Sequence, residues 1–160
     1  MLEGETDLGR WRVHWVAAVS LVRSVGYVLK KVDGQDHVVD AVATSRFTAW
    51  RGSDPEHGVF RGFIEKARHN VLREYELGIH PAEKVPIVLQ TLLQGDNADP
   101  RTVIAEVAVL GRNIYRPVVD GYRQGDDARD VLNDAIGWWQ KQLDAIDLEI
   151  AARKGSGARR

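Results

Sequence analysis

The segment from Asp7 to Lys31, DLGRWRVHWVAAVSLVRSVGYVLKK, carries the clearest structural pattern in the chain. Its apolar residues recur at intervals of four, three, four, three and four positions, and this spacing places them on one face of an α-helix. The face comprises Trp11, Trp15, Ala18, Val22, Val25 and Leu29. The basic residues lie mostly off it: Arg10, Arg12, Arg23, Lys30 and Lys31. We expect the helix to end at Asp33-Gly34, because glycine accepts the left-handed cap conformation.

The end of the chain shows a matching pattern. Asp126 or Asp127 can cap a helix that ends near Arg153, since carboxylates accept hydrogen bonds from the first free amides. Its apolar face comprises Leu132, Ala135, Trp139, Leu143, Ile146 and Ile150. Long first and last helices with similar seams predict antiparallel packing in a bundle. Residues 154–160 place Gly and Ser between basic residues and predict a flexible basic tail.

Two further helices are expected between these. One runs from Asp36 to Trp50 and presents Val38, Val39, Val42, Phe47 and Trp50. The next begins at Ser53-Asp54-Pro55-Glu56, where a capping-box arrangement coincides with a proline suited to the first turn. We expect it to end at Gly78, before Pro81. Its buried stripe would comprise Phe60, Ile64, Ala67, Val71 and Tyr75, with Phe63 alongside.

The pattern changes between residues 85 and 125. The runs 86–93 and 102–110 are short and rich in β-branched residues, with turn formers over 94–100 between them. An antiparallel hairpin is favoured, and two short helices are the alternative, because short apolar runs do not separate the two by period. Residues 111–125 resemble a loop with a helical turn near Tyr115 to Tyr122. The predicted fold is therefore mainly α: an antiparallel helical bundle over residues 1–153, with a small β-hairpin inserted between the third and last long helices.

Composition bounds the function. The chain has 160 residues, which favours one domain, and no cysteine, which excludes disulfides, zinc–thiolate sites, iron–sulfur clusters and cysteine nucleophiles. We find no secretory signal at the start and no segment suited to span a bilayer, so we expect a cytoplasmic protein without a membrane partner. The formal net charge is −1. General nucleic-acid binders carry a basic excess, so any nucleic-acid contact here must be local.

Familiar site motifs are missing from the sequence. No two of the five histidines are three or four residues apart, which argues against a helical metal site. Glycine-rich nucleotide loops and the hydrolase nucleophile elbow do not occur either. We therefore expect no metal and no cofactor.

The five tryptophans are many for this length. Packing in the core or at a dimer interface is the favoured interpretation. The alternative is a small-ligand pocket between the first and last helices, lined by Trp11, Trp15 and Trp139. Trp138 and Trp139 are adjacent and so about 100° apart on a helix. One is expected to face the core while the other covers a flank or a partner chain.

The third predicted helix carries a polar cluster. Arg68, His69, Asn70 and Arg73 interleave with its apolar stripe, and residues three, four or seven apart share a face. One interpretation is a solvated face whose ion pairs contribute only about 0.3–0.5 kcal/mol each. The other is a polar contact surface formed by these four residues and Tyr75.

This stretch resembles the HEPN helical-bundle families of prokaryotic toxins and defence proteins. Their hallmark is an arginine, then a polar residue, then a histidine a few positions on. Arg68-His69 matches the opening, and Phe60 and Phe63 resemble the aromatic lead-in. No histidine follows at the family's spacing, although His80 lies further along. The missing histidine argues against acid–base catalysis of the family type.

Three functional hypotheses follow, two from this resemblance and one from the tryptophans. The leading one is a non-enzymatic HEPN-like bundle that forms a homodimer and binds RNA or an antitoxin-like protein through Arg68, His69, Asn70, Arg73 and Tyr75. The second is a metal-independent ribonuclease, a toxin or defence protein, that uses Arg68 with His69 or His80. The third is the small-ligand-binding bundle with its tryptophan-lined pocket.

Overall fold

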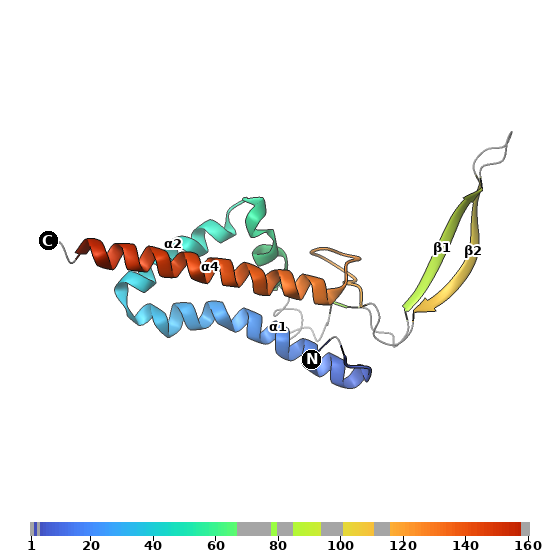
Figure 1. The fold of residues 1–160 in the computed structure, drawn as a ribbon, viewed down its shortest axis with the longest axis horizontal. Helices are drawn as coiled ribbons and strands as arrows, with labels where there is room; N and C mark the ends of the chain where they lie inside the picture. Colours follow the sequence, from blue (N-terminus) through green and yellow to red (C-terminus); the bar gives the residue numbers. More distant parts are fainter. Residues whose placement is uncertain are drawn as a thin grey trace.

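The computed structural model describes residues 2, 4–66, 78–79, 85–93, 101–110 and 116–157. Within these residues the protein is mainly helical, and three long helices form a bundle (Figure 1). They are α1 (Leu8–Lys31), α2 (His37–Arg51) and α4 (Ala128–Gly157). The predicted helical class is confirmed.

The three helices begin where carboxylates can cap them. Asp7 accepts a hydrogen bond from the amide of Arg10 at 2.8 Å, and Asp36 accepts one from Val38 at 2.8 Å. Asp127 accepts one from the amide of Arg129 at 2.9 Å. Each carboxylate satisfies a backbone donor that has no partner within the helix. These three helix starts were predictable because capping depends only on local sequence.

The buried face of α1 is close to the predicted one. Trp11, Trp15, Val22 and Leu29 are buried as expected, whereas Ala18 and Val25 are only half-buried. Val19 and Gly26 complete the buried face. The helix ends at Lys31, just before the predicted stop at Asp33-Gly34. Gly34, however, lies in a 3₁₀ turn, η1 (Asp33–Gln35), and is not among the described glycines with positive φ. The left-handed cap predicted there is therefore wrong.

The chain after α2 is irregular before it becomes helical. A 3₁₀ turn, η2 (Pro55–His57), is capped by Asp54 and is followed by a π-helical turn, η3 (Phe60–Ile64). The π-helical turn buries Phe60, Phe63 and Ile64. A Cβ atom on Gly62 would lie 2.5 Å from Cδ2 of Tyr122, so only glycine fits under that ring. The remainder of the predicted third helix, residues 67–77, lies outside the described residues.

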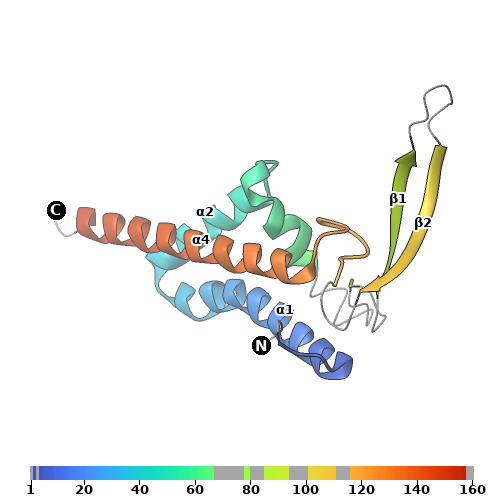
Figure 2. The same cartoon turned by 45° about the vertical axis from the view of Figure 1, so that its right-hand side comes forward.

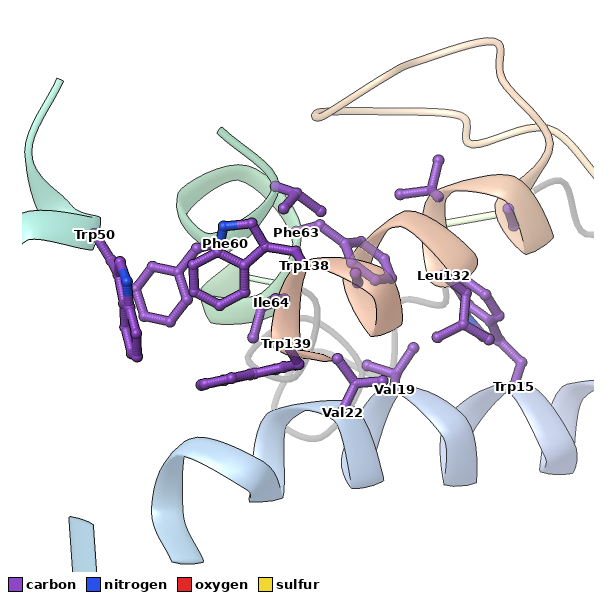
Figure 3. Close-up of a cluster of buried hydrophobic side chains, with 14 of the residues drawn as sticks. Trp15, Val19, Val22, Trp50, Phe60, Phe63, Ile64, Leu132, Trp138 and Trp139 are labelled. Atoms are coloured by element: carbon purple, nitrogen blue, oxygen red, sulfur yellow. The ribbon is translucent and has the colours of Figure 1, made fainter. Parts of the chain in front are cut away.

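Aromatic rings fill the centre of the bundle (Figure 3). Trp50 is fully buried, and its ring centroid lies 4.7 Å from Phe47 and 5.0 Å from Trp138. Trp139 packs edge-on against the same ring at 5.4 Å. Both Trp138 and Trp139 are buried, so the expectation that one of them covers a flank is wrong. The wide ring of Trp138 reaches the core from a position beside the main seam.

One buried hydrogen bond crosses this aromatic cluster. Nε1 of Trp50 donates to Oε1 of Gln142 at 2.8 Å, and Gln142 is only 5% exposed. A buried indole N–H without an acceptor would cost about 1–3 kcal/mol. The bond therefore fixes how far α2 lies along α4.

The start of α4 is anchored beside the start of α1. The guanidinium of Arg116 is fully buried and lies 5.7 Å from the ring centroid of Trp11. The amide of Ala128 donates to the carbonyl of Arg116 at 2.8 Å, and the amide of Arg116 donates to Oδ2 of Asp127 at 3.0 Å. Burial raises the pKa of Asp127, but hydrogen bonds from Arg129 and Arg116 outweigh burial and lower that pKa below its usual value.

Consequently α1 and α4 run in the same direction, and α2 runs opposite to both (Figures 1 and 2). The predicted antiparallel packing of the first and last helices is wrong. The two helices have similar apolar faces, but an apolar face does not specify whether a neighbouring helix runs parallel or antiparallel to it. The contact of Arg116 with Trp11 holds the start of α4 beside the start of α1. The helical turn predicted near Tyr115 to Tyr122 is also absent from its described part: residues 117 and 118 form isolated β-bridges.

Ion pairs hold the other end of α4 to α2. Nζ of Lys154 lies 2.7 Å from Oδ2 of Asp36, and Glu149 pairs with Arg46 at 2.9 Å and with Arg153 at 2.6 Å. The hydrogen bond from Arg153, and to a smaller extent the one from Arg46, lowers the pKa of Glu149. Because α4 continues to Gly157, the tail predicted from residue 154 is wrong at its start, and residues 158–160 lie outside the described residues.

Two strands are described between the helical parts. β1 (Val85–Leu93) and β2 (Arg101–Leu110) are antiparallel, with Val85 opposite Leu110 and a register irregularity between Leu89 and Gln90. Both views draw the strands to one side of the bundle (Figures 1 and 2).

The Trp50–Gln142 bond can be tested with Gln142→Met, which keeps the volume but removes the acceptor. We expect the free energy of unfolding to fall by about 1–3 kcal/mol, because the buried indole N–H loses its partner. A double-mutant cycle with Trp50→Phe should show a coupling energy of about 0.5–3 kcal/mol in urea unfolding. The control is Gln140→Met, at an exposed position of the same helix. Equal effects at both glutamines would contradict the assignment.

The Lys154–Asp36 pair predicts a pH dependence. The hydrogen bond from Lys154, with the amide of Val38, lowers the pKa of Asp36 from 3.8 to about 2. Because this folded-state pKa lies below the unfolded one, the ionised carboxylate stabilises the fold above the unfolded value, and that contribution is lost as the pH falls through the folded value. In Asp36→Asn, which retains a capping side chain, urea unfolding between about pH 5 and pH 2 should depend less on pH. Parallel curves for the two proteins would refute this role.

Candidate functional site

The polar contact surface expected from the sequence cannot be placed. Arg68, His69, Asn70, Arg73 and Tyr75 lie outside the described residues, as does His80. The contact-surface and ribonuclease hypotheses at these residues therefore stay predictions.

The structure places the three tryptophans of the ligand-pocket hypothesis in the packed core. The rings of Trp11 and Trp15 stack at 5.7 Å with an interplanar angle of 12°, and both are almost fully buried. Trp139 is 3% exposed and packs against Trp50. Their rings fill space between the helices, so the cavity described next lies elsewhere.

A groove with a volume of about 610 Å³ lies between α1 and α2. We call it the α1–α2 groove. Four of its lining residues are cationic, four carry hydroxyl groups on short side chains, two are aromatic, and none of those described is acidic. The lining residues are Ser20, Arg23, Ser24, Gly26, Tyr27, Lys30, Lys31, Thr44, Phe47, Thr48 and Arg51.

The composition of α1 explains the charge of the groove. Leu8–Lys31 contains five lysines and arginines and no aspartate or glutamate. Arg23, Tyr27 and Lys30 follow at i, i+4 and i+7, which puts them on one side of the helix. This side lies beside the buried face, so these residues line the groove toward α2 while remaining accessible to solvent.

Gly26 sets the depth of the groove. A Cβ atom there would lie 3.2 Å from Cζ of Phe47 and 3.3 Å from Cη2 of Trp139. The glycine thus lets the ring of Phe47 approach the backbone of α1. Phe47 also packs edge-on against Trp50 at 4.7 Å. The core therefore holds this apolar part of the groove lining in position.

Lys30 and Arg51 of the groove lining form ion pairs. Nζ of Lys30 lies 2.5 Å from Oδ1 of Asp40 and also donates to the hydroxyl of Thr44. Nε and Nη2 of Arg51 donate to Oε1 of Glu65 at 2.9 and 2.8 Å. Each pair leaves other N–H donors on the same cation, because lysine has three and arginine five. A ligand can therefore bind these cations without breaking the existing contacts.

Two groove hydroxyls have their protons directed to helix carbonyls. Oγ of Ser24 donates to the carbonyl of Leu21 at 2.7 Å, and Oγ1 of Thr48 donates to that of Thr44 at 3.0 Å. A hydroxyl has one proton and two lone pairs. The remaining lone pairs of Ser24 and Thr48 can accept a hydrogen bond from a ligand.

The cations of the groove lining suit the binding of an anion.

Other kinds of site have less support. The described lining residues include no histidine or carboxylate for proton transfer. No group of three or more histidine, aspartate or glutamate side chains is placed to hold a metal ion in the described part of the chain. No helix among the same residues is both long and apolar enough to cross a membrane.

Sequence reasoning missed this site. The basic residues of the first helix were noted only as lying off its apolar face. The usable clue was the run of 24 residues with five cations and no acid, which is unusual in a chain with a net charge of −1. The sequence of α2 gave no comparable clue, because Thr44, Phe47 and Thr48 show no unusual charge or spacing.

Comparisons with family models, curated proteins and solved structures gave no match to this chain.

Proposed function

We propose that the chain is a non-enzymatic helical-bundle protein that acts by binding a phosphate-bearing ligand in the α1–α2 groove. One observation carries the proposal: four cations line one groove that has no acidic residue among those described. Phosphate oxygens accept charge-assisted hydrogen bonds from lysine and arginine, and arginine matches them with two parallel N–H groups.

The distribution of charge supports the same ligand class. The whole chain is nearly neutral, so general attraction to polyanions is weak. The cations of α1 nevertheless concentrate a positive potential over one groove, whose wall includes the apolar ring of Phe47. This fits the local contact that the sequence required of any nucleic-acid ligand. It also fits a small phosphate compound.

Inorganic tripolyphosphate is the probe that tests the proposal. We expect binding to the full chain in isothermal titration calorimetry, with the affinity reduced about tenfold in Lys31→Gln and in Arg23→Gln. A hydrogen bond to a charged group contributes about 1.5–3 kcal/mol, and 1.4 kcal/mol corresponds to tenfold. The affinity should also fall less steeply with added salt in each variant, because one cation fewer faces the phosphates.

Lys141→Gln is the matched control, because Lys141 is an exposed cation of α4 outside the groove lining. It should bind tripolyphosphate like the wild type. Absence of binding by the wild type, or equal losses in Lys141→Gln and Lys31→Gln, would overturn the proposal.

We also propose that the protein forms a homodimer through the outer side of α1. Val13, Leu21 and Val28 on this side are 67%, 67% and 42% exposed, and Val32 just beyond the helix is 55% exposed. Of these, Val13 and Val32 are symmetric about the midpoint of residues 22 and 23. An antiparallel pair of α1 helices would put Val13 against a second copy's Val32, Ala17 against its Val28, and Leu21 against its Ser24 at the edge of the α1–α2 groove. A two-fold interface needs such a self-complementary surface.

Leu21→Glu should convert this dimer to a monomer in sedimentation velocity, because two carboxylates would be buried near the two-fold axis. The control is Leu148→Glu, since Leu148 is 74% exposed and belongs to α4 instead of α1. A wild-type protein that remains monomeric at high concentration would exclude the homodimer.

A further inference from the structure

We propose that the ligand of the α1–α2 groove is a nucleoside phosphate, with its base stacked on Tyr27 and its phosphate held by Arg23 and Lys31. This inference rests on the proposed function, since it names the ligand class of the same groove. It draws on features of the groove that phosphate binding alone does not need: two aromatic rings and hydroxyl acceptors.

The two aromatic rings differ in how they are held. Phe47 is half-buried, and the core holds it through Trp50 and through Phe60, whose ring centroid lies 5.9 Å away. Tyr27 lines the groove from α1 but is 64% exposed. The ring of Tyr27 is therefore accessible, and aromatic surface is a common lining of small-molecule sites. A flat base can lie on Tyr27 beside the fixed apolar surface of Phe47.

The spacing of Arg23, Tyr27 and Lys31 along α1 places a cation on each side of an aromatic ring, as a nucleotide's base and phosphate would require. Tyr27 lies four residues after Arg23 and four before Lys31, so each cation is about 6 Å from it along the helix axis. Cations alternating with an aromatic ring are the general pattern of sites that bind single nucleotides of a strand without reading sequence. A base on Tyr27 thus has a phosphate-binding cation on either side.

The hydroxyl groups indicate what kind of base fits. Ser24 and Thr48 direct their protons to the carbonyls of Leu21 and Thr44, so both present lone pairs. Acceptors of this kind pair with the exocyclic amino group of adenine, which uracil lacks. The groove volume of about 610 Å³ lies within the range of about 300–1,000 Å³ found for small-molecule sites. The groove therefore suits an adenine nucleotide better than a uracil one.

Calorimetry of the full chain with ATP, UTP and tripolyphosphate in magnesium-free buffer tests this. We expect ATP to bind about tenfold more tightly than tripolyphosphate, since stacking on an aromatic ring contributes an affinity gain of this order. Charge alone predicts the reverse order, because tripolyphosphate carries more charge per atom. Tyr27→Ala should remove the advantage of ATP and leave tripolyphosphate binding unchanged. Tyr27→Phe should retain the advantage.

The outcomes distinguish the nucleoside assignment from phosphate binding in general. Equal binding of ATP and tripolyphosphate, or equal losses for both in Tyr27→Ala, would overturn the nucleoside assignment and leave phosphate binding standing. Failure of all three ligands to bind would overturn the proposed function as well. UTP binding as tightly as ATP would refute the role of Ser24 and Thr48.

A fourth titration with a short adenine oligoribonucleotide separates the two sources of this chemistry. Tighter binding of the oligonucleotide than of ATP supports a single strand as the ligand. Equal or weaker binding supports a free nucleotide.

Discussion

The hydrogen bond from the indole of Trp50 to Gln142 is the constraint on which the rest of the bundle depends. Apolar contacts tolerate small slides of one helix along another, but a buried N–H has its acceptor in only one position. The bond fixes α2 on α4, and Trp138 and Trp139 then close around Trp50. Trp139 in turn meets Gly26, so the position of α1 follows.

The same contacts shape the groove. Phe47 belongs to both, because it packs against Trp50 in the core and lines the cavity between α1 and α2. Lys30 and Arg51 are held by Asp40 and Glu65. A site whose walls are set by the core loses little conformational entropy when a ligand binds. Under the proposed function, this rigidity would favour the binding of an anion in the groove.

In this protein the positions of the charged residues, and not the net charge, indicate where an anion can bind. The sum over the chain is −1 and predicts no affinity for polyanions. The first helix alone carries five cations and no acid, and one side of it borders α2. The electrostatic field at a site depends on nearby groups in a low-dielectric setting far more than on the total charge. Among the acidic residues, Asp40 and Glu65 pair with Lys30 and Arg51 but are not part of the described groove lining.

The sequence by itself determined where α1, α2 and α4 begin, at Asp7, at Asp36 and at Asp126 or Asp127, and periodicity identified Trp11, Trp15, Leu132 and Trp139 as buried. These features depend on hydrogen bonds and spacing within a few residues. Only the tertiary structure decided the direction of α4, through Arg116 on Trp11, and the pairing of Gln142 with Trp50. It also assembled the groove. Such contacts join residues distant in sequence, and periodicity, which reports only which side of a helix is apolar, cannot specify which helix lies against that side or in which direction.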